Sequence, residues 1–344
     1  MIRTSLAAAG LLLGLLGSGM PAPARAADAV SVAALHFVSS APIFIAKDKG
    51  YFAAEGLDVE IKFFDAAQPI AVAVAAGDAD FGITGLTAGF YNLAAKGVLK
   101  IIAAQSREEP GYDFVAYIVS NKAWDAGFRS VTQYPGKSVG ITQVGSTFHY
   151  NMGMLAEKLG FPLSAVALKP LQSIPNVVAA LKGNQVDSVL LPNNIALGLV
   201  AQHAGHIIGY VWQETPWQLG ALFTSAKNVA KRRDLVQRFV RAYQKACADY
   251  AAAFLQRDAS GKRVFGAKAD ALIPIIQKYV QPRPSRAQVL ASVSYIDPKA
   301  RLEVGDIYRQ VAWYQKMGMV DRSAKTATML DLGFIPHQLD MPRQ

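Results

Sequence analysis

Short apolar segments alternate with helix-length segments along the first two-thirds of the chain. Val59, Ile61 and Phe63 alternate with charged residues, which is the period of a strand with one buried face. Helices are expected to begin near Pro42 and Pro69, because proline is tolerated in a first turn. The expected strands of this series are residues 30–35, 58–64, 81–83, 99–104 and 114–119. Strands and helices that alternate at this spacing predict an α/β fold with parallel sheets.

The same alternation repeats in the next part of the chain. The expected strands of this second series are residues 137–142, 165–168, 186–191 and 207–212. In each series an apolar helix ends at a glycine, Gly77 or Gly183, and an aspartate and a buried strand follow. Two successive series of similar build predict two α/β lobes.

Beyond Ser225 the pattern is helical. The expected helices are residues 228–254, 267–280, 286–294 and 301–318. Cys247 lies beside two alanines in the first of them, with no histidine nearby in sequence, which favours a packed thiol over a nucleophile. The two lobes are therefore expected to carry a helical C-terminal extension.

The N-terminus has the pattern of a secretory leader. Arg3 provides a positive start, residues 6–16 are uncharged, and Ala24 and Ala26 form the small-residue pattern that a signal peptidase accepts. An uncleaved anchor is the alternative, but the apolar run is short for a membrane span. We expect a signal peptide over residues 1–26, export to the periplasm, and a mature monomer that does not insert into the membrane.

Composition excludes several classes of site. Of the 344 residues, 52% are hydrophobic and 17% charged, so long disorder is not expected. A single cysteine excludes an intramolecular disulfide and any multi-cysteine metal site, and no HExxH motif is present. We therefore expect no metal, no cofactor and no catalytic residues.

The formal net charge of +10 is unevenly distributed. Residues 222–344 hold 21 basic and 10 acidic side chains, whereas residues 27–221 hold 12 and 15. A nucleic-acid groove is disfavoured, because the basic residues lie on expected helices without interleaved aromatic residues. A solvated helical surface is favoured, and a surface facing anionic membranes remains an alternative.

Residues 41–60, APIFIAKDKGYFAAEGLDVE, resemble the opening of periplasmic solute-binding proteins of the nitrate, sulfonate, taurine and thiamine-precursor (NMT1/THI5-like) group. Residues 77–83 and 139–141 are also similar to that group. The resemblance implies a two-lobed, type II Venus-flytrap fold that closes on a small-molecule ligand and delivers it to the permease subunits of an ABC importer. A related branch of pyrimidine-synthesising enzymes uses a cysteine-rich motif, which this chain lacks.

The resemblance also implies how the lobes divide the chain. Lobe 1 would comprise residues 27–118 and 222–344, and lobe 2 residues 119–221. Residues 115–121 and 219–225 would be the strands that cross between the lobes.

Ligands of open α/β sheets bind beyond the carboxyl ends of the strands, near helix N-termini. That rule nominates loops, and the candidate ligand-binding residues in or beside them are His36, Phe37, Ser39, Gln68, Thr84, Tyr112, Ser146, Thr147, Phe148, His149, Asn193 and Trp217. The Gly145-Ser146-Thr147 turn is the strongest anion candidate, and a plain N-cap is the alternative. The aromatic residues offer an apolar clamp, and the expected ligand is a small organic anion, a sulfonate or a carboxylate.

Two other classes of function stay open. A periplasmic sensor would present its ligand to a membrane protein instead of a permease. A secreted hydrolase would need an activated nucleophile, and the sequence has no GxSxG motif.

Overall fold

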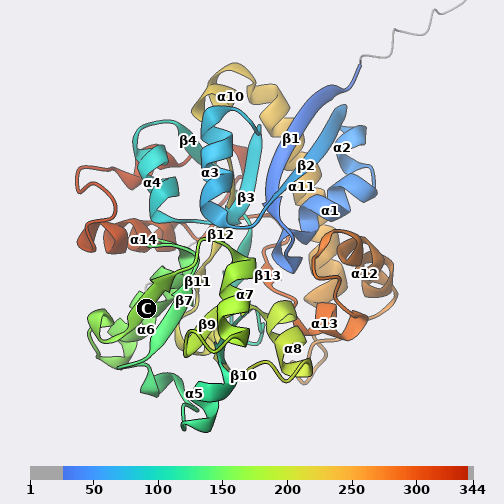
Figure 1. The fold of residues 1–344 in the computed structure, drawn as a ribbon. Helices are drawn as coiled ribbons and strands as arrows, with labels where there is room; N and C mark the ends of the chain where they lie inside the picture. The colour runs from blue at the N-terminus through green and yellow to red at the C-terminus, as the bar shows by residue number, and fades with distance from the viewer. Residues whose placement is uncertain (1–25, 340–344) are drawn as a thin grey trace, which may run out of the picture.

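Two five-stranded sheets form the framework of the computed structural model, which describes residues 26–339. In Figure 1 one sheet lies above the other, and the chain passes from the upper part to the lower part and back. The expected leader lies almost wholly outside the described residues. None of the described helices is long and apolar enough to cross a membrane.

The first sheet is mixed rather than parallel. Its strands in spatial order are β2 (Leu57–Phe64), β1 (Asp28–Leu35), β3 (Phe81–Gly85), β12 (Gly220–Ser225) and β4 (Leu99–Ala104). β1 pairs in parallel with β2 and β3, whereas β12 is antiparallel to β3 and β4. The prediction of a parallel sheet is wrong at β12, because this strand returns from the second sheet and runs against the strands that it separates. The helices beside this sheet are α1 (Ala41–Asp48), α2 (Tyr51–Ala54), α3 (Ala67–Ala76) and α4 (Ala88–Ala95).

The second sheet has the same mixed character. Its strands in spatial order are β10 (His206–Tyr210), β6 (Val115–Val119), β9 (Ser188–Pro192), β7 (Ser138–Ile141) and β8 (Ala167–Pro170). β7 pairs in parallel with β8 and β9, and β6 is antiparallel to β9 and β10. Its helices are α5 (Asn121–Asp125), α6 (Thr147–Leu159), α7 (Ile174–Lys182), α8 (Asn193–Ala201) and α9 (Val211–Glu214).

A third, small sheet lies where the chain passes between the two large ones. It consists of β11 (Trp217–Gln218), β5 (Ser106–Glu108) and β13 (Tyr295–Ile296), in that order. The expected crossing segments, residues 115–121 and 219–225, do not cross: β6 pairs wholly within the second sheet and β12 wholly within the first. Long apolar strands pair along their whole length inside one sheet, so the crossings fall in the shorter and more polar segments that precede β6 and β12.

The C-terminal part is helical, as the pattern predicts. Its helices are α10 (Ala226–Lys231), α11 (Arg233–Phe254), α12 (Ala267–Tyr279), α13 (Arg286–Ala291) and α14 (Val304–Lys316). The single helix expected over residues 228–254 is broken at Arg232, whose φ of −132° is not helical and whose guanidinium pairs with Asp80 at 2.6 Å. Cys247 is fully buried in α11, and burial raises the pKa of its thiol.

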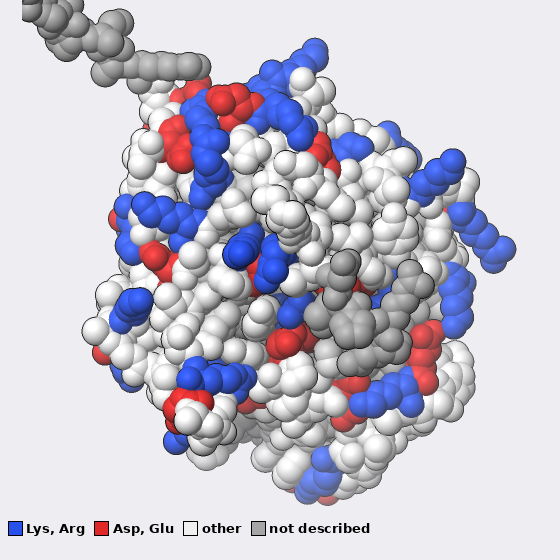
Figure 2. All heavy atoms as spheres, turned by 180° about the vertical axis from the view of Figure 1, so that it is seen from behind, with Lys and Arg blue, Asp and Glu red and all other residues white. Residues whose placement is uncertain are grey.

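Basic side chains of the C-terminal part form ion pairs with acidic residues near them. Arg238 pairs with Asp28 at 2.6 Å, and Arg241 pairs with Glu55 at 2.7 Å. Figure 2 shows basic and acidic side chains interspersed over the face opposite to that of Figure 1. Ion pairs that join α11 to residues near β1 and β2 agree with a solvated helical surface.

Candidate functional site

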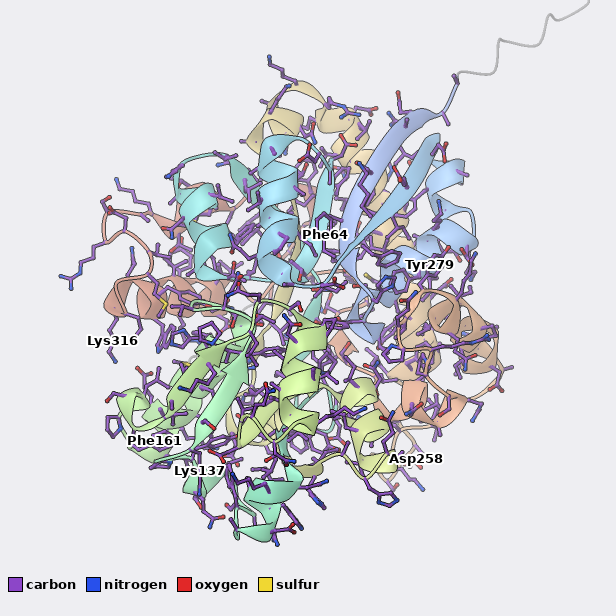
Figure 3. All side chains as sticks on the ribbon, viewed as in Figure 1. Phe64, Lys137, Phe161, Asp258, Tyr279 and Lys316 are labelled. Atoms are coloured by element: carbon purple, nitrogen blue, oxygen red, sulfur yellow. The ribbon has the colours of Figure 1, made fainter. Side chains whose placement is uncertain are left out.

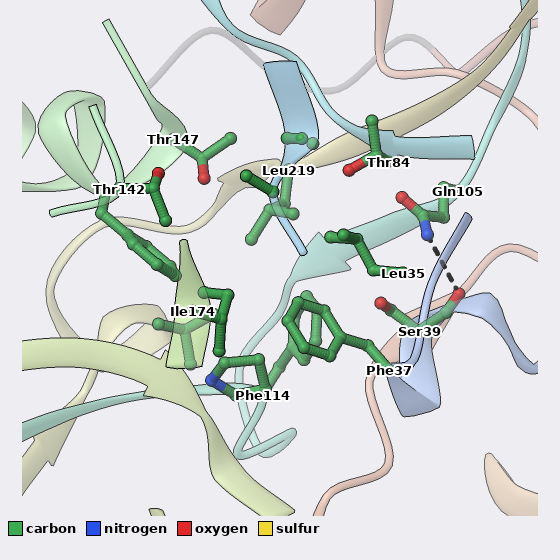
Figure 4. A pocket seen from close by; sticks show the side chains of 16 residues that line it. Leu35, Phe37, Ser39, Thr84, Gln105, Phe114, Thr142, Thr147, Ile174 and Leu219 are labelled. Carbon is green, nitrogen blue, oxygen red and sulfur yellow. Dashed lines mark hydrogen bonds between the residues drawn. The ribbon is translucent and has the colours of Figure 1, made fainter. Parts of the chain in front are cut away.

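A small cavity lies between the two large sheets, with a volume of about 40 Å³. Its lining residues, drawn in Figure 4, are Leu35, Phe37, Ser39, Ala66, Ala67, Thr84, Gly85, Gln105, Phe114, Val115, Thr142, Thr147, Phe148, Ile174, Pro192 and Leu219. We call this the inner cavity. Leu35, Gly85 and Pro192 are the last residues of β1, β3 and β9, so the cavity lies at the carboxyl ends of strands from both sheets.

The inner cavity has mostly apolar walls, a few polar groups and no charged side chain. Five of its lining residues carry a hydroxyl or amide group, namely Ser39, Thr84, Gln105, Thr142 and Thr147, and no Lys, Arg, His, Asp or Glu side chain is among them. Ala67, Thr147 and Ile174 are the first residues of α3, α6 and α7, so three helices begin at its wall. Helix N-termini carry partial positive charge and free amide groups, which favour a negatively charged group.

Two buried oxygen atoms of the inner cavity have no hydrogen-bond partner among the described residues. The Thr84 side chain is 2% exposed and its Oγ1 is unpaired. Gln105 Nε2 donates to the Ser39 carbonyl at 3.3 Å, and since that carbonyl only accepts, the amide orientation is fixed and Oε1 is left unpaired. Figure 4 shows Thr84 and Gln105 near each other on one side of the cavity. An unsatisfied buried polar group costs about 1–3 kcal/mol, so a ligand or water that bonds to these two oxygens would be stabilised here.

Five of the twelve nominated residues line the inner cavity: Phe37, Ser39, Thr84, Thr147 and Phe148. They lie at or just beyond the ends of β1, β3 and β7, which belong to both sheets, as the strand-end rule predicts. His36 is not among the lining residues, and it borders the larger cavity described below.

The side chains of Ser146 and His149 form hydrogen bonds within the turn that begins α6. Ser146 Oγ accepts a hydrogen bond from the His149 backbone N–H at 3.3 Å, which is the N-cap arrangement. His149 Nδ1 accepts from the Gly145 N–H at 3.0 Å, and burial lowers the pKa of His149. Of the Gly145-Ser146-Thr147 turn, only Thr147 lines the inner cavity.

The other four nominated residues are packed elsewhere. Gln68 accepts from Thr87 Oγ1 at 2.5 Å. Tyr112 is buried against Tyr295. Asn193 Nδ2 donates to the Ala291 carbonyl at 3.0 Å, and the Trp217 ring lies 4.7 Å from that of Tyr150.

The sequence analysis did not nominate Gln105, Thr142, Phe114 or Leu219. Gln105 and Thr142 directly follow β4 and β7, so the strand-end rule applied to every strand would have found both. Phe114 and Leu219 directly precede β6 and β12, where the chain passes between the sheets; Leu219 falls inside one of the crossing segments that the resemblance implied, and Phe114 lies just before the other. Arg107, a possible anion partner, pairs with Glu109 at 2.8 Å and lies 4.6 Å from the Tyr295 ring.

A second cavity adjoins the first and has a volume of about 460 Å³. It is lined by Leu35, His36, Phe37, Phe64, Asp65, Ile174, Pro175, Val178, Ile195, Gln281 and Pro282. We call this the outer cavity. Leu35, Phe37 and Ile174 line both cavities, so the two are continuous around these side chains.

Direct backbone contacts hold the two sheets together around the inner cavity. The Ala88 N–H donates to the Gly145 carbonyl at 2.9 Å, and the Ile174 N–H donates to the Asp65 carbonyl at 3.1 Å. Gly145 has a φ of +77°, and a Cβ there would lie 2.7 Å from Ala88 Cβ, so glycine permits this approach. The structure therefore has a closed cleft.

α14 contacts both halves of the molecule. Tyr314 Oη donates to the Ser146 carbonyl at 3.3 Å, and Lys316 pairs with Glu157 of α6 at 2.7 Å. A Cβ on Gly153 of α6 would lie 2.1 Å from Trp313 Cζ2, so the indole covers this glycine. On the side of the first sheet, the Tyr314 ring lies 5.8 Å from that of Tyr91.

Within residues 26–339 no group of three or more His, Cys, Asp or Glu side chains is arranged to hold a metal ion. The polar groups of the inner cavity are instead hydroxyls and an amide, which suit hydrogen bonding to a small molecule.

Residues 38–253 match the profile of the NMT1/THI5-like family. The chain belongs to this family. No curated protein matches the chain.

Solved structures share the fold of this NMT1/THI5-like chain. The alkanesulfonate-binding protein SsuA from Xanthomonas axonopodis pv. citri, bound to MOPS, is 16% identical with a TM-score of 0.70, and the match covers 90% of this chain and 100% of that one. The nitrate-binding protein NrtA from Synechocystis PCC 6803 is 15% identical with a TM-score of 0.67, covering 87% and 84%. The desulfurization enzyme DSZB is 13% identical with a TM-score of 0.61, covering 89% and 97%. The chain thus has the two-lobed periplasmic-binding-protein fold.

Proposed function

We propose that this protein is a periplasmic solute-binding protein that captures a small organic anion between its lobes and delivers it to an ABC importer. The observation that carries the proposal is the closed inner cavity, in which the buried oxygens of Thr84 and Gln105 have no partner. Family membership and the binding proteins among the structural relatives support it.

Two features favour an anion with a single charged head group. Three helix N-termini meet at the inner cavity, and hydroxyls of Thr84, Thr142 and Thr147 can donate hydrogen bonds. No cationic side chain lines it, so a multiply charged ion would be poorly compensated. An organic anion needs only its head satisfied, and the apolar walls Phe37, Phe114 and Phe148 suit the carbon atoms next to that head.

The transport role rests on expectations from the sequence. The leader predicts export to the periplasm, and the family resemblance implies permease subunits as partners of a monomer. The alternative is a sensor that presents the ligand to another membrane protein. Loss of growth on the ligand as a nutrient after deletion of the gene would support transport, whereas loss of a transcriptional response alone would support sensing.

A thermal-shift screen of the purified mature chain tests the binding role. Nitrate, alkanesulfonates, aliphatic and aromatic carboxylates and pyrimidines should be compared. A ligand at 100 times its dissociation constant adds about 2.7 kcal/mol of stability, which moves the unfolding midpoint measurably. We expect a shift with a monovalent organic anion; a shift with nitrate alone, or with neutral pyrimidines alone, would contradict the ligand class.

The fold also carries an enzyme, DSZB, so the screen needs a second readout. Native mass spectrometry should find the shifted ligand bound and chemically unchanged. Steady formation of a product from that ligand would contradict the binding role and support catalysis.

A further inference from the structure

We propose that the outer cavity is a second subsite, which holds an apolar tail of the same ligand whose anionic head lies in the inner cavity. This rests on the proposed function and assigns its ligand class, a monovalent anion with an extended aliphatic or aromatic tail. The subsite is built from the loops after β1 and β2, the N-terminal ends of α7 and α8, and the Gln281-Pro282 segment.

The volumes of the two cavities indicate that the head group and the tail of the ligand bind in different places. A cavity needs about 10–15 Å³ of such volume to hold one water molecule, so the 40 Å³ inner cavity has room for a few water molecules or one small head group. Cavities that enclose whole organic ligands measure about 300–1,000 Å³, a range that includes the 460 Å³ of the outer cavity. In the closed form, an organic body must therefore extend outward.

The two cavities meet at the residues that line both of them. Phe37 is only partly buried and lines both cavities, together with Leu35 and Ile174. In Figure 4 the Thr84, Thr142 and Thr147 side chains lie along one side of the inner cavity, and the Phe37 ring lies toward the other. The three threonine side chains thus lie away from Phe37, which suits an anionic head group at that end of the cavity.

The side chains that line the outer cavity determine which kind of ligand tail can bind there. Apolar side chains dominate it, namely those of Phe64, Pro175, Val178, Ile195 and Pro282. Its acidic residue is Asp65, which disfavours a second negative charge at the far end of the ligand. His36 Nδ1 lies 2.6 Å from the Tyr279 carbonyl, which only accepts, so this nitrogen carries a proton and is already used.

A chain-length series tests the subsite by calorimetry. Straight-chain alkanesulfonates and carboxylates of two to ten carbons should be titrated into the full mature chain. Burying one methylene is worth about 0.8 kcal/mol, so affinity should rise up to about fourfold per added carbon until the outer cavity is filled. An α,ω-dicarboxylate should bind more weakly than the monocarboxylate of the same length.

Two substitutions test whether the ligand tail binds in the outer cavity. Val178→Trp should fill the outer cavity, so it should remove the gain from long chains while the two-carbon anion binds as before. Val200→Trp, at a 40% exposed position on the neighbouring helix α8, is the matched control and should leave the whole series unchanged.

The outcomes separate this subsite from the proposed function. Binding of short anions with no dependence on chain length, or equal weakening of all lengths by Val178→Trp, would overturn the subsite alone. Failure of every anion to bind would overturn both.

Discussion

The two sides of the interlobe contact differ in how they are filled. On one side α14 packs on α6, and Trp313, Tyr314 and Lys316 make ring, hydrogen-bond and ion-pair contacts. On the other side the lobes enclose the outer cavity, which Phe64 and Val178 border. Figure 3 shows Lys316 at the left, at the end of α14, and Phe64 to its right.

This difference indicates how the cleft would open. Opening on the side of α14 would separate the buried Trp313 and Tyr314 side chains from α6. Opening on the side of the outer cavity would break the Ile174–Asp65 and Asn193–Ala291 hydrogen bonds, but it would separate no buried aromatic rings there, because a hollow space already lies between the walls. We therefore expect the ligand to enter through the outer cavity, with the α14 side acting as the pivot.

The largest expected effect is that of Trp313→Ala. The Trp313 side chain is 5% exposed and lies against His149, Tyr150 and Gly153, so its loss should reduce the free energy of unfolding by about 3–5 kcal/mol. Phe64→Ala should cost less than half as much, because that ring already borders a cavity. Urea unfolding of both variants measures the difference, and equal losses would contradict the contrast between the two sides.

The next largest effect is expected for Gly153 of α6, which lies against the Trp313 ring. Gly153→Ala places a methyl group where the Trp313 indole lies, so we expect a loss of about 1–3 kcal/mol. In the Trp313→Ala background the same substitution should cost much less, since the clash is gone. Additive losses in a double-mutant cycle would show that the indole does not press on Gly153.

The stability of the protein is expected to depend on pH through His149, which lies on the α14 side of the interlobe contact. Burial lowers the pKa of His149 below the usual 6.5, so the unfolded chain binds a proton more readily than the folded one. Stability should therefore be full above about pH 6.5 and fall as the pH drops, with a limiting slope of about 1.4 kcal/mol per pH unit. His149→Asn should flatten this slope between pH 7 and 5 in thermal unfolding, and an unchanged slope would exclude His149 as its source.

The smallest effect belongs to the ion pair between Lys316 and Glu157. Their side chains are 69% and 47% exposed, so Lys316→Ala should change stability by less than about 1 kcal/mol. The change should shrink further in 1 M salt. A larger, salt-independent loss would mean that the pair, rather than the Trp313 ring, holds this side of the cleft.

Much of the fold could be predicted from local patterns, because strand alternation and helix starts are local properties. The direction of β12 and β6 could not, since it depends on which sheet a strand enters after crossing. The three-stranded sheet was missed because β11 and β13 have two residues each, too few to show a period. The break at Arg232 depends on a tertiary partner, Asp80, 152 residues away in sequence.

Only part of the candidate site could be predicted, again because local sequence does not show tertiary contacts. The strand-end rule identifies loops, and it led to Phe37, Thr84 and Thr147. It does not say which side chain of a loop faces the cavity, so Ser146 and His149 were nominated although they bond within their own turn.

The most direct test of the account is the affinity of an organic anion for variants of the inner cavity. The anion that gives the largest thermal shift should be titrated by calorimetry into the natural protein, Thr84→Val, Thr147→Val and, as a control, Thr132→Val at an exposed position. Each lost hydrogen bond to a charged head group should weaken binding by about 1–3 kcal/mol in the two cavity variants and not in the control. Unchanged affinity in both folded cavity variants would contradict the placement of the anion between the lobes.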